Sequence, residues 1–224
     1  TVNGIDPHKV FTSQTASTSI WFSFIINVSS FSGTGEYFMT LRNTANTTYF
    51  ARLFARNSSG SLQFGTSKGS ATATNYSGTY SYGTTYLVVA RYDWSTATSS
   101  NDNFYVWINP DISSEPGTGT ATYSIEGGTD PSFGSAINSI MLHQRSATNT
   151  PSASIEGIRV SANSNVTTGW EQLDCHAKTF YSKSTGNLNL TSNWGHKNNG
   201  KGSHCPNFTE NLKTYNIRNS ATHT

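Results

Sequence analysis

Alternation between apolar and polar side chains over short segments is the feature that most constrains how this chain can fold. Its clearest case places apolar residues at every second position: Ile20, Phe22, Phe24, Ile26 and Val28. Successive side chains of a β-strand point to opposite faces, so these residues are expected to line a core while Trp21 faces the other way. The segment therefore predicts a strand with one fully buried face.

Similar short segments recur along the chain and are separated by turn-forming residues. Further strands are predicted at residues 36–42, 49–56, 61–66, 85–92, 103–109, 121–126, 137–144 and 154–161. The tetrapeptide Asn-Ser-Ser-Gly at 57–60 and the pentapeptide Gly-Gly-Thr-Asp-Pro at 127–131 are typical of connections between strands. No window keeps helical apolar spacing for three turns. The pattern predicts an all-β sandwich with very little helix.

Charge and hydropathy limit the classes of partner and the cellular compartments that suit this sequence. Only 12% of the residues are charged, the net charge is +2, and the densest basic run, at 197–201, holds two lysines, so nucleic acid is not expected as a partner. No segment approaches the roughly 18 apolar residues of a membrane helix, so direct membrane insertion is not expected. Few charges and many hydroxyl side chains favour an extracellular or cell-surface location. The chain begins at Thr1 without a signal-peptide pattern, so we expect a mature or excised fragment.

Four segments carry a family resemblance through their order and spacing: residues 21–24 (WFSF), 86–92 (YLVVARY), 106–110 (VWINP) and 155–160 (IEGIRV). They resemble the laminin G-like, concanavalin A-like domains of exported bacterial surface proteins of the Bacteroidota type, over about residues 1–170. The resemblance implies a jelly roll of two antiparallel sheets, one of them concave. The family's usual residue before Gly-Ile-Arg-Val is aspartate; here Glu156 keeps the charge but moves the carboxylate by one methylene. The slip in alternation at Gly157 predicts a bulge that returns Ile158 and Val160 to the core face.

The remaining residues, 171–224, differ in texture and are expected to form a short β-rich extension. The segments FYSKSTGNLN at 180–189, NWG at 193–195 and YNIRN at 215–219 resemble the opening of a β-rich module of type IX secretion cargo. That module continues in its family, whereas here the pattern stops at His223-Thr224. The second unit is therefore expected to be either a truncated fragment or a unit that needs a neighbouring chain to cover its exposed strand edge, which makes self-association a further hypothesis.

Cys175 and Cys205 are the only cysteines, and both fall in the extension. In an exported chain a disulfide between them is the first expectation, closing a loop of about 30 residues and stabilising a weakly cored segment by roughly 3 to 4 kcal/mol. The neighbouring His176 and His204 leave a tetrahedral zinc site as the alternative, although the compact Cys-x-x-Cys spacing of common zinc modules is missing.

The sequence offers little that indicates catalysis. Glycoside hydrolases of related architecture use paired carboxylates close together on one strand, and the twelve acidic residues here are isolated. Some lyases of this architecture use a His and a Tyr instead, and His143 lies in a predicted strand, but it shares a face with Met141 and is expected to be packed or at the rim. We therefore expect a chain that is not an enzyme.

Aromatic side chains opposite the core are the candidates for ligand binding, because flat rings stack on the apolar faces of sugars. Trp21, Tyr105 and Trp107 fall on such faces, and Asn109 could add a polar contact. The alternative is that the three rings pack beneath long loops as a second hydrophobic layer. A glycan or surface polymer is the expected partner.

A structural calcium ion is the expected cofactor, partly through the resemblance. Related sandwiches hold calcium between an acidic residue of the last core strand and oxygen atoms near the N-terminus, positions matched by Glu156 and Asp6. Carboxylate and carbonyl oxygens are the ligands that calcium prefers. The alternative is that Glu156 forms a surface ion pair with Arg159 or a lysine.

Together these observations predict a non-catalytic, extracellular adhesive or carbohydrate-binding sandwich from a larger surface protein. The alternative is a structural subunit of a fibre or surface layer, assembled through its strand edges and its C-terminal segment. A jelly-roll polysaccharide lyase or hydrolase is the third hypothesis.

Overall fold

A computed structural model of the chain describes residues 6–15, 17–45, 48–112, 114–132, 135–145 and 149–163. It also describes residues 169–170, 173, 179–182, 185–186, 194–195, 214–216 and 222–223. The chain divides into two compact units, one of residues 1–110 with 116–164 and one of residues 111–115 with 165–224. The domain boundary predicted after residue 170 stays a prediction.

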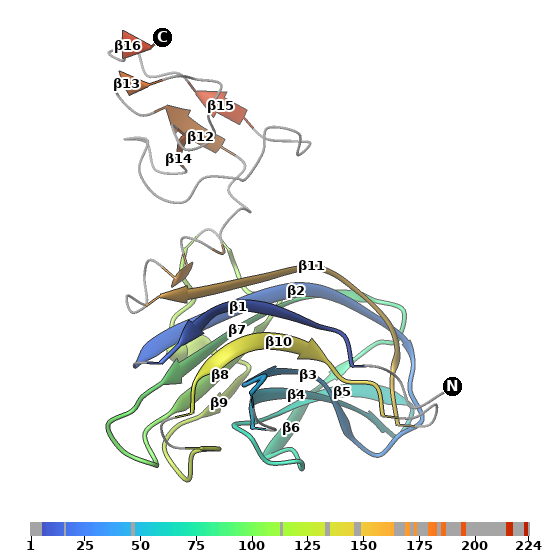
Figure 1. Cartoon of the computed structure of the whole chain (residues 1–224). Helices are drawn as coiled ribbons and strands as arrows, with labels where there is room; N and C mark the ends of the chain where they lie inside the picture. The colour runs from blue at the N-terminus through green and yellow to red at the C-terminus, as the bar shows by residue number, and fades with distance from the viewer. Residues whose placement is uncertain are drawn as a thin grey trace. The chain divides into compact units, whose positions relative to one another are not determined.

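The larger unit is a sandwich of two sheets (Figure 1). The six-stranded sheet has, from edge to edge, the strands β1 (His8–Gln14), β10 (Ile137–Leu142), β3 (Glu36–Arg42), β4 (Tyr49–Ser58), β5 (Ser61–Ser67) and β6 (Asn75–Tyr80). The five-stranded sheet has the order β11 (Ser152–Asn163), β2 (Thr18–Ser30), β7 (Thr85–Trp94), β8 (Asn103–Ile108) and β9 (Tyr123–Ile125). All neighbouring strands in both sheets run antiparallel. The predicted all-β jelly roll is confirmed.

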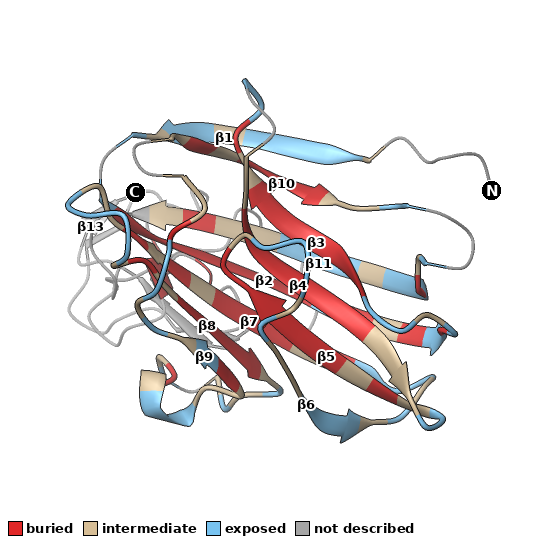
Figure 2. Ribbon diagram, turned by 90° about the horizontal axis from the view of Figure 1, so that it is seen from below, coloured by how far each residue is buried: buried red, intermediate tan, exposed pale blue. Residues whose placement is uncertain are grey.

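The core lies between the two sheets and is filled mainly by every second residue of the strands. The inward set predicted for β2 is buried: Ile20, Phe22, Phe24, Ile26 and Val28. Figure 2 shows buried backbone along the central strands of both sheets and exposure at their ends. Among the described residues of the sandwich, the one helical element is a 3-10 turn, η1 (Thr118–Thr120). Among those residues there is no helix long and apolar enough to cross a membrane.

The predicted irregularity in β11 is present, but it does less than expected. Gly157 has a φ of 62°, and the pairing of β11 with β2 shifts register between Glu156 and Arg159. Val160 packs against the core as predicted. Ile158 does not, because the extra residue of the bulge leaves it outside the ladder, and it is 40% exposed.

The smaller unit contains short strands. β12 (Thr179–Ser182) pairs antiparallel with β14 (Trp194–Gly195) and parallel with β15 (Thr214–Asn216). β13 (Thr185–Gly186) pairs parallel with β16 (Thr222–His223). Cys175 and Cys205 lie outside the described residues, so both the disulfide and its zinc alternative stay predictions.

Candidate functional site

The outer face of the six-stranded sheet gathers the chain's most unusual set of side chains. In Figure 1 β10 arches, and the face of its sheet turned away from β2 and β11 lies on the hollow side of the arch; Figure 2 is seen from that side. The outward residues form what we call the arginine–tyrosine face: Tyr37, Arg42, Tyr49, Arg52, Arg56, Tyr76 and His143.

Two irregularities in neighbouring strands create this face. In β4, Phe50 and Ala51 both belong to the core, and Ala51 takes a φ of 50°. Strict alternation would separate Tyr49 from Arg52, but the two consecutive inward residues put both side chains outside, with the Arg52 Cζ atom 4.7 Å from the Tyr49 ring centroid.

The same arrangement recurs one strand away. In β3, Phe38 and Met39 both belong to the core, and the pairing with β4 shifts register beside Met39. Tyr37 and Arg42 therefore lie on the same outer side, next to the outward residues of β4. Strict alternation of inward and outward side chains would not bring these tyrosines and arginines together on the hollow side of the sheet.

Flat groups stack along the face in alternation. The His143 and Tyr37 rings lie 4.1 Å apart at 5°. The Arg52 guanidinium contacts both tyrosines, with its Cζ atom 4.4 Å from the Tyr37 ring centroid and 4.7 Å from that of Tyr49. The Arg42 Cζ atom is 5.9 Å from the Tyr49 ring centroid. Cation–π contacts of this kind strengthen when they are shielded from water.

A second, shorter stack continues the face along β4. The Arg56 Cζ atom lies 4.1 Å above the Tyr76 ring, and Arg56 Nε donates a hydrogen bond to Gln63 Oε1 at 2.9 Å. Phe54 packs between the stacks, with its centroid 5.8 Å from that of Tyr37 and 6.3 Å from that of Tyr76.

Arg52 is the exceptional member, because it is a cation with only 8% of its surface exposed. Burial lowers the pKa of its guanidinium, and Tyr37, Tyr49 and Glu36 oppose that shift. Its Nε has no hydrogen-bond partner, and neither has that of Arg42. Among the described residues no carboxylate pairs with Arg42, Arg52 or Arg56.

The acidic groups nearby are engaged elsewhere. Glu36 accepts from Arg145 Nη1 at 3.0 Å. Asp6 contacts His143 Nδ1 at 3.1 Å and accepts from the Gln144 amide at 2.8 Å. Because a carboxylate accepts, His143 donates through Nδ1 in this contact and keeps Nε2 for another partner. Burial raises the pKa of Tyr37, with Arg52 opposing.

The side chains predicted to bind a ligand lie on the other sheet. Trp21, Tyr105 and Trp107 are 0%, 6% and 2% exposed, and the two tryptophan rings stack at 5.7 Å. Trp107 Nε1 donates to the Gly117 carbonyl at 3.2 Å. Asn109 ends β8 with a φ of 50°, and its Oδ1 accepts from the Leu87 amide at 2.8 Å. Ligand binding by these four residues stays a prediction.

The two residues predicted to hold calcium lie in different parts of the sandwich. Asp6 lies beside His143 at the end of β10, whereas Glu156 is exposed on β11 opposite Ile25 of β2. Among the described residues no group of three or more His, Cys, Asp or Glu side chains is arranged to hold a metal. Calcium stays a prediction.

An apolar pocket of about 480 Å³ opens at the edge of the sandwich. It is lined mainly by aliphatic and aromatic side chains of β1, β10 and β11, among them Val10, Phe11, Leu142 and Val160. Apart from His8 and Lys9 its lining residues are apolar, so the arginine–tyrosine face, with several polar side chains together, is the stronger candidate site.

Comparison with known proteins gives a fold and no family. No family model and no curated protein sequence matches the chain. Among solved structures, a pentraxin from Limulus polyphemus is 16% identical over 71% of each chain, with a TM-score of 0.45. An alginate lyase is 16% identical over 71% of this chain and 73% of its own, with a TM-score of 0.44. A glucuronan lyase from Trichoderma reesei is 11% identical over 70% and 75%, with a TM-score of 0.43.

These comparisons correct one expectation from the sequence. The missing carboxylate pair led to the prediction that the chain is not an enzyme, and that prediction does not hold, because the fold is shared with several polysaccharide lyases and so does not exclude catalysis. A carboxylate pair serves glycoside hydrolysis and is no general requirement for cleaving sugar polymers. The likeness itself shows a shared fold.

Proposed function

We propose that this chain binds an acidic polysaccharide on the arginine–tyrosine face. The observation that carries the proposal is Arg52, a buried cation without a carboxylate partner among the described residues. Buried charges in proteins are normally paired, since desolvation without a partner is strongly unfavourable. A carboxylate or sulfate group of a ligand would supply the missing partner, and guanidinium groups bind such oxyanions through paired hydrogen bonds.

The arginines form a row, which favours a polymer over a single anion. Tyr49, which contacts Arg42, is followed along β4 by Arg52 and then Arg56. Arg52 and Arg56 are four residues apart on one strand, a separation of about 13 Å at about 3.3 Å per residue. A chain of sugars that carries a charge at intervals can meet several guanidinium groups at once.

Cleavage by β-elimination is the second candidate function, favoured by the grouping of His143, Tyr37 and Arg52. In this reaction a cation neutralises the carboxylate of a uronate, a base removes the C5 proton, and the C4–O bond breaks as C4=C5 forms. His143 Nε2 would take the proton, and Tyr37, whose pKa burial raises, would return one to the departing oxygen. Arg52 would face the carboxylate.

Binding is tested with a polyuronate such as polygalacturonate, with neutral dextran as the control polymer. We expect Arg52→Met to weaken polyuronate binding at least about tenfold, the equivalent of one charge-assisted hydrogen bond. Added salt should weaken binding by the wild-type chain. Arg159→Met, on β11 of the other sheet, is the matched control and should bind normally. Equal binding of dextran, or full binding by Arg52→Met, would contradict the proposal.

Elimination is followed in the same samples by the ultraviolet absorbance of the new C4=C5 bond. His143→Gln should abolish the absorbance and leave binding in place, whereas Arg52→Met should reduce both. Polyuronates that bind but yield no unsaturated product would contradict the lyase candidate and leave the binding proposal standing.

Other proposals rest on the sequence alone. They are a structural calcium ion held by Asp6 and Glu156, an extracellular or cell-surface location, and self-association through the C-terminal segment, which would also suit a fibre or layer subunit. Origin in a larger exported bacterial protein of the laminin G-like kind, with a type IX secretion module, is likewise a proposal from the resemblance. A melting temperature unchanged by chelator would contradict the calcium proposal.

A further inference from the structure

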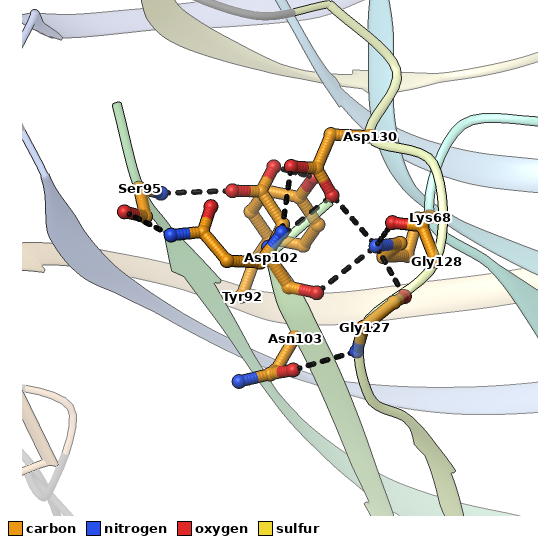
Figure 3. Close-up of polar contacts among 9 residues, drawn as sticks. Lys68, Tyr92, Ser95, Asp102, Asn103, Gly127, Gly128 and Asp130 are labelled. Atoms are coloured by element: carbon orange, nitrogen blue, oxygen red, sulfur yellow. Dashed lines mark hydrogen bonds and ion pairs between the residues drawn. The ribbon is translucent and has the colours of Figure 1, made fainter. Parts of the chain in front are cut away.

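Loops from both sheets meet at the ammonium group of Lys68, which is not a member of the arginine–tyrosine face. Lys68 follows β5, Asp102 precedes β8, and Gly127, Gly128 and Asp130 follow β9. Lys68 Nζ donates to the carbonyl oxygens of Asp102, Gly127 and Gly128 at 3.0, 2.6 and 2.8 Å (Figure 3). It also contacts Asp130 Oδ1 at 2.6 Å.

This arrangement has the composition of a cation site. An ammonium has three N–H donors, yet four oxygens converge on Nζ, so they surround the charge rather than match individual hydrogens. Three are backbone carbonyls and one is a carboxylate, the kinds of oxygen ligand that calcium takes, and water would complete the six to eight ligands that calcium needs. Gly127 and Gly128 have successive φ angles of 63° and 73°, a left-handed turn that aims both carbonyls at one point.

The shell is held together without help from the lysine. The Asp130 carboxylate accepts from the amides of Asn101 at 3.1 Å and Asp102 at 3.2 Å. The Asp102 carboxylate accepts from the Tyr92 hydroxyl at 2.6 Å and from the Ser95 amide at 2.8 Å (Figure 3). These bonds keep the oxygens converged on the same point if the ammonium is removed.

The site is closed to solvent. The side chains of Lys68 and Asp130 are 6% and 2% exposed. Deleting one partner of an ion pair this buried strongly destabilises the folded protein, because the charge of the other partner is left uncompensated. Loss of the ammonium would leave Asp130 in need of another cation, with the Asp102 carboxylate near enough to interact with it electrostatically.

We propose that these loops form a calcium-type cation site that the Lys68 ammonium fills from within the chain. Removing the lysine side chain opens the shell to a small hard cation from solution, and Ca²⁺ balances the carboxylates of Asp130 and Asp102. In the natural chain the tethered ammonium makes this junction of the two sheets independent of the cation concentration. The proposal does not depend on the function of the arginine–tyrosine face.

The test compares Lys68→Ala with the wild-type chain in thermal unfolding and in calorimetric titration with Ca²⁺. Lys68→Ala should melt lower than wild type and regain stability with calcium. At a calcium concentration about 100 times Kd, its folding equilibrium constant should rise about 100-fold. Lys68→Met, which fills the space of the lysine stem as far as Cε without the charge, should be destabilised and gain less from calcium than Lys68→Ala. Lys68→Ala combined with Asp130→Asn should also lose the calcium response.

Each alternative result decides the matter. A calcium response of Lys68→Ala no larger than that of wild type would overturn the proposal, as would a response that survives Asp130→Asn. Rescue by methylammonium but not by calcium would show a shell specific for ammonium and overturn the metal assignment. If Lys68→Ala cannot be purified folded, it is refolded from denaturant: recovery that depends on calcium supports the proposal, and failure with calcium contradicts it.

Discussion

Single residues of this chain take backbone conformations that their side chains disfavour, and Ser59 is the simplest case. It connects β4 to β5 in a two-residue turn with Gly60, because Ser58 pairs directly with Ser61. Ser59 has a φ of 52° and Gly60 a φ of 86°, as a type I′ turn requires. Asparagine tolerates this region better than serine. The turn has the geometry that a two-residue hairpin favours, but its first position holds serine rather than the asparagine that this geometry prefers.

We therefore expect Ser59→Asn to raise the free energy of unfolding by about 0.5 to 1 kcal/mol, measured by urea unfolding. The side chain is exposed, so no packing is lost. Ser58→Asn, one residue earlier in the strand, is the control and should be neutral or slightly destabilising, since asparagine is disfavoured in strands. A loss of stability in Ser59→Asn would show that the turn does not limit the hairpin.

Apart from His143, which was considered as a lyase residue, the residues of the candidate site were not predicted from the sequence, and the reason is physical. Alternation correctly placed Trp21 and Trp107 opposite the core, because β2 and β8 are regular. Arg52 belongs to a strand in which two consecutive apolar residues both face inward, and period-two reasoning from Tyr49 assigns it to the wrong side. The pair Phe50-Ala51 is a signal for such a bulge only once the partner strand is known.

At the scale of elements, the close approach of β5 and β6 depends on Gly65. A Cβ atom there would lie 2.6 Å from the Asn75 carbonyl oxygen and 2.6 Å from Cδ1 of Tyr76. Both contacts are far shorter than van der Waals distance, so the ring of Tyr76 lies over the glycine and is held beneath Arg56. The glycine is what lets the edge strand contribute to the face.

Gly65→Ala should therefore lower the free energy of unfolding by about 1 to 3 kcal/mol, the usual effect of overpacking. Displacing Tyr76 should also weaken polyuronate binding. Gly117→Ala is the matched control: Gly117 has an ordinary φ of −66°, and a Cβ atom added there would meet nothing within 4 Å, so no change is expected. Chemical unfolding of both variants checks this, and equal stabilities would contradict the packing argument.

Element boundaries followed burial closely. The strand predicted at 36–42 agrees with β3, whose inward residues are large and apolar. The edge strands β1 and β6 were not predicted. Their sequences, HKVFTSQ and NYSGTY, are mostly polar and exposed or half-buried, because an edge strand has one neighbour and little core to cover. Alternation is a weak signal where neither face is fully buried.

For the whole molecule, the two-sheet architecture was predictable because it follows from many independent alternations and turns. The junction of the sheets at Lys68 was not, because the lysine and its ligands come from three separate loops and most of the ligands are backbone carbonyls, which leave no trace in a sequence. The same junction couples the stability of the sandwich to pH through Asp102. Burial raises the pKa of this carboxyl, with the Tyr92 and Ser95 hydrogen bonds opposing.

The sign of that coupling follows from the raised pKa. Unfolding lets Asp102 ionise at its ordinary pKa of about 3.9, below its pKa in the folded chain. Its contribution to stability is therefore complete below that pH and declines as pH rises through the folded pKa. We expect the unfolding free energy of wild type, relative to that of Asp102→Asn, to fall as the pH rises from about 3.9 through the pKa of Asp102 in the folded chain. Urea unfolding at a series of pH values measures this difference. A difference that is constant or rises with pH would contradict it.

The stack of His143, Tyr37, Arg52 and Tyr49 has a thermodynamic consequence for whatever associates with it. Each flat side chain packs against its neighbours, so these side chains lose their conformational entropy when the polypeptide folds rather than when a complex forms. Capture of an oxyanion then needs no further ordering of the receiving groups. We expect such a surface to release heat on association with a small entropic penalty from the protein.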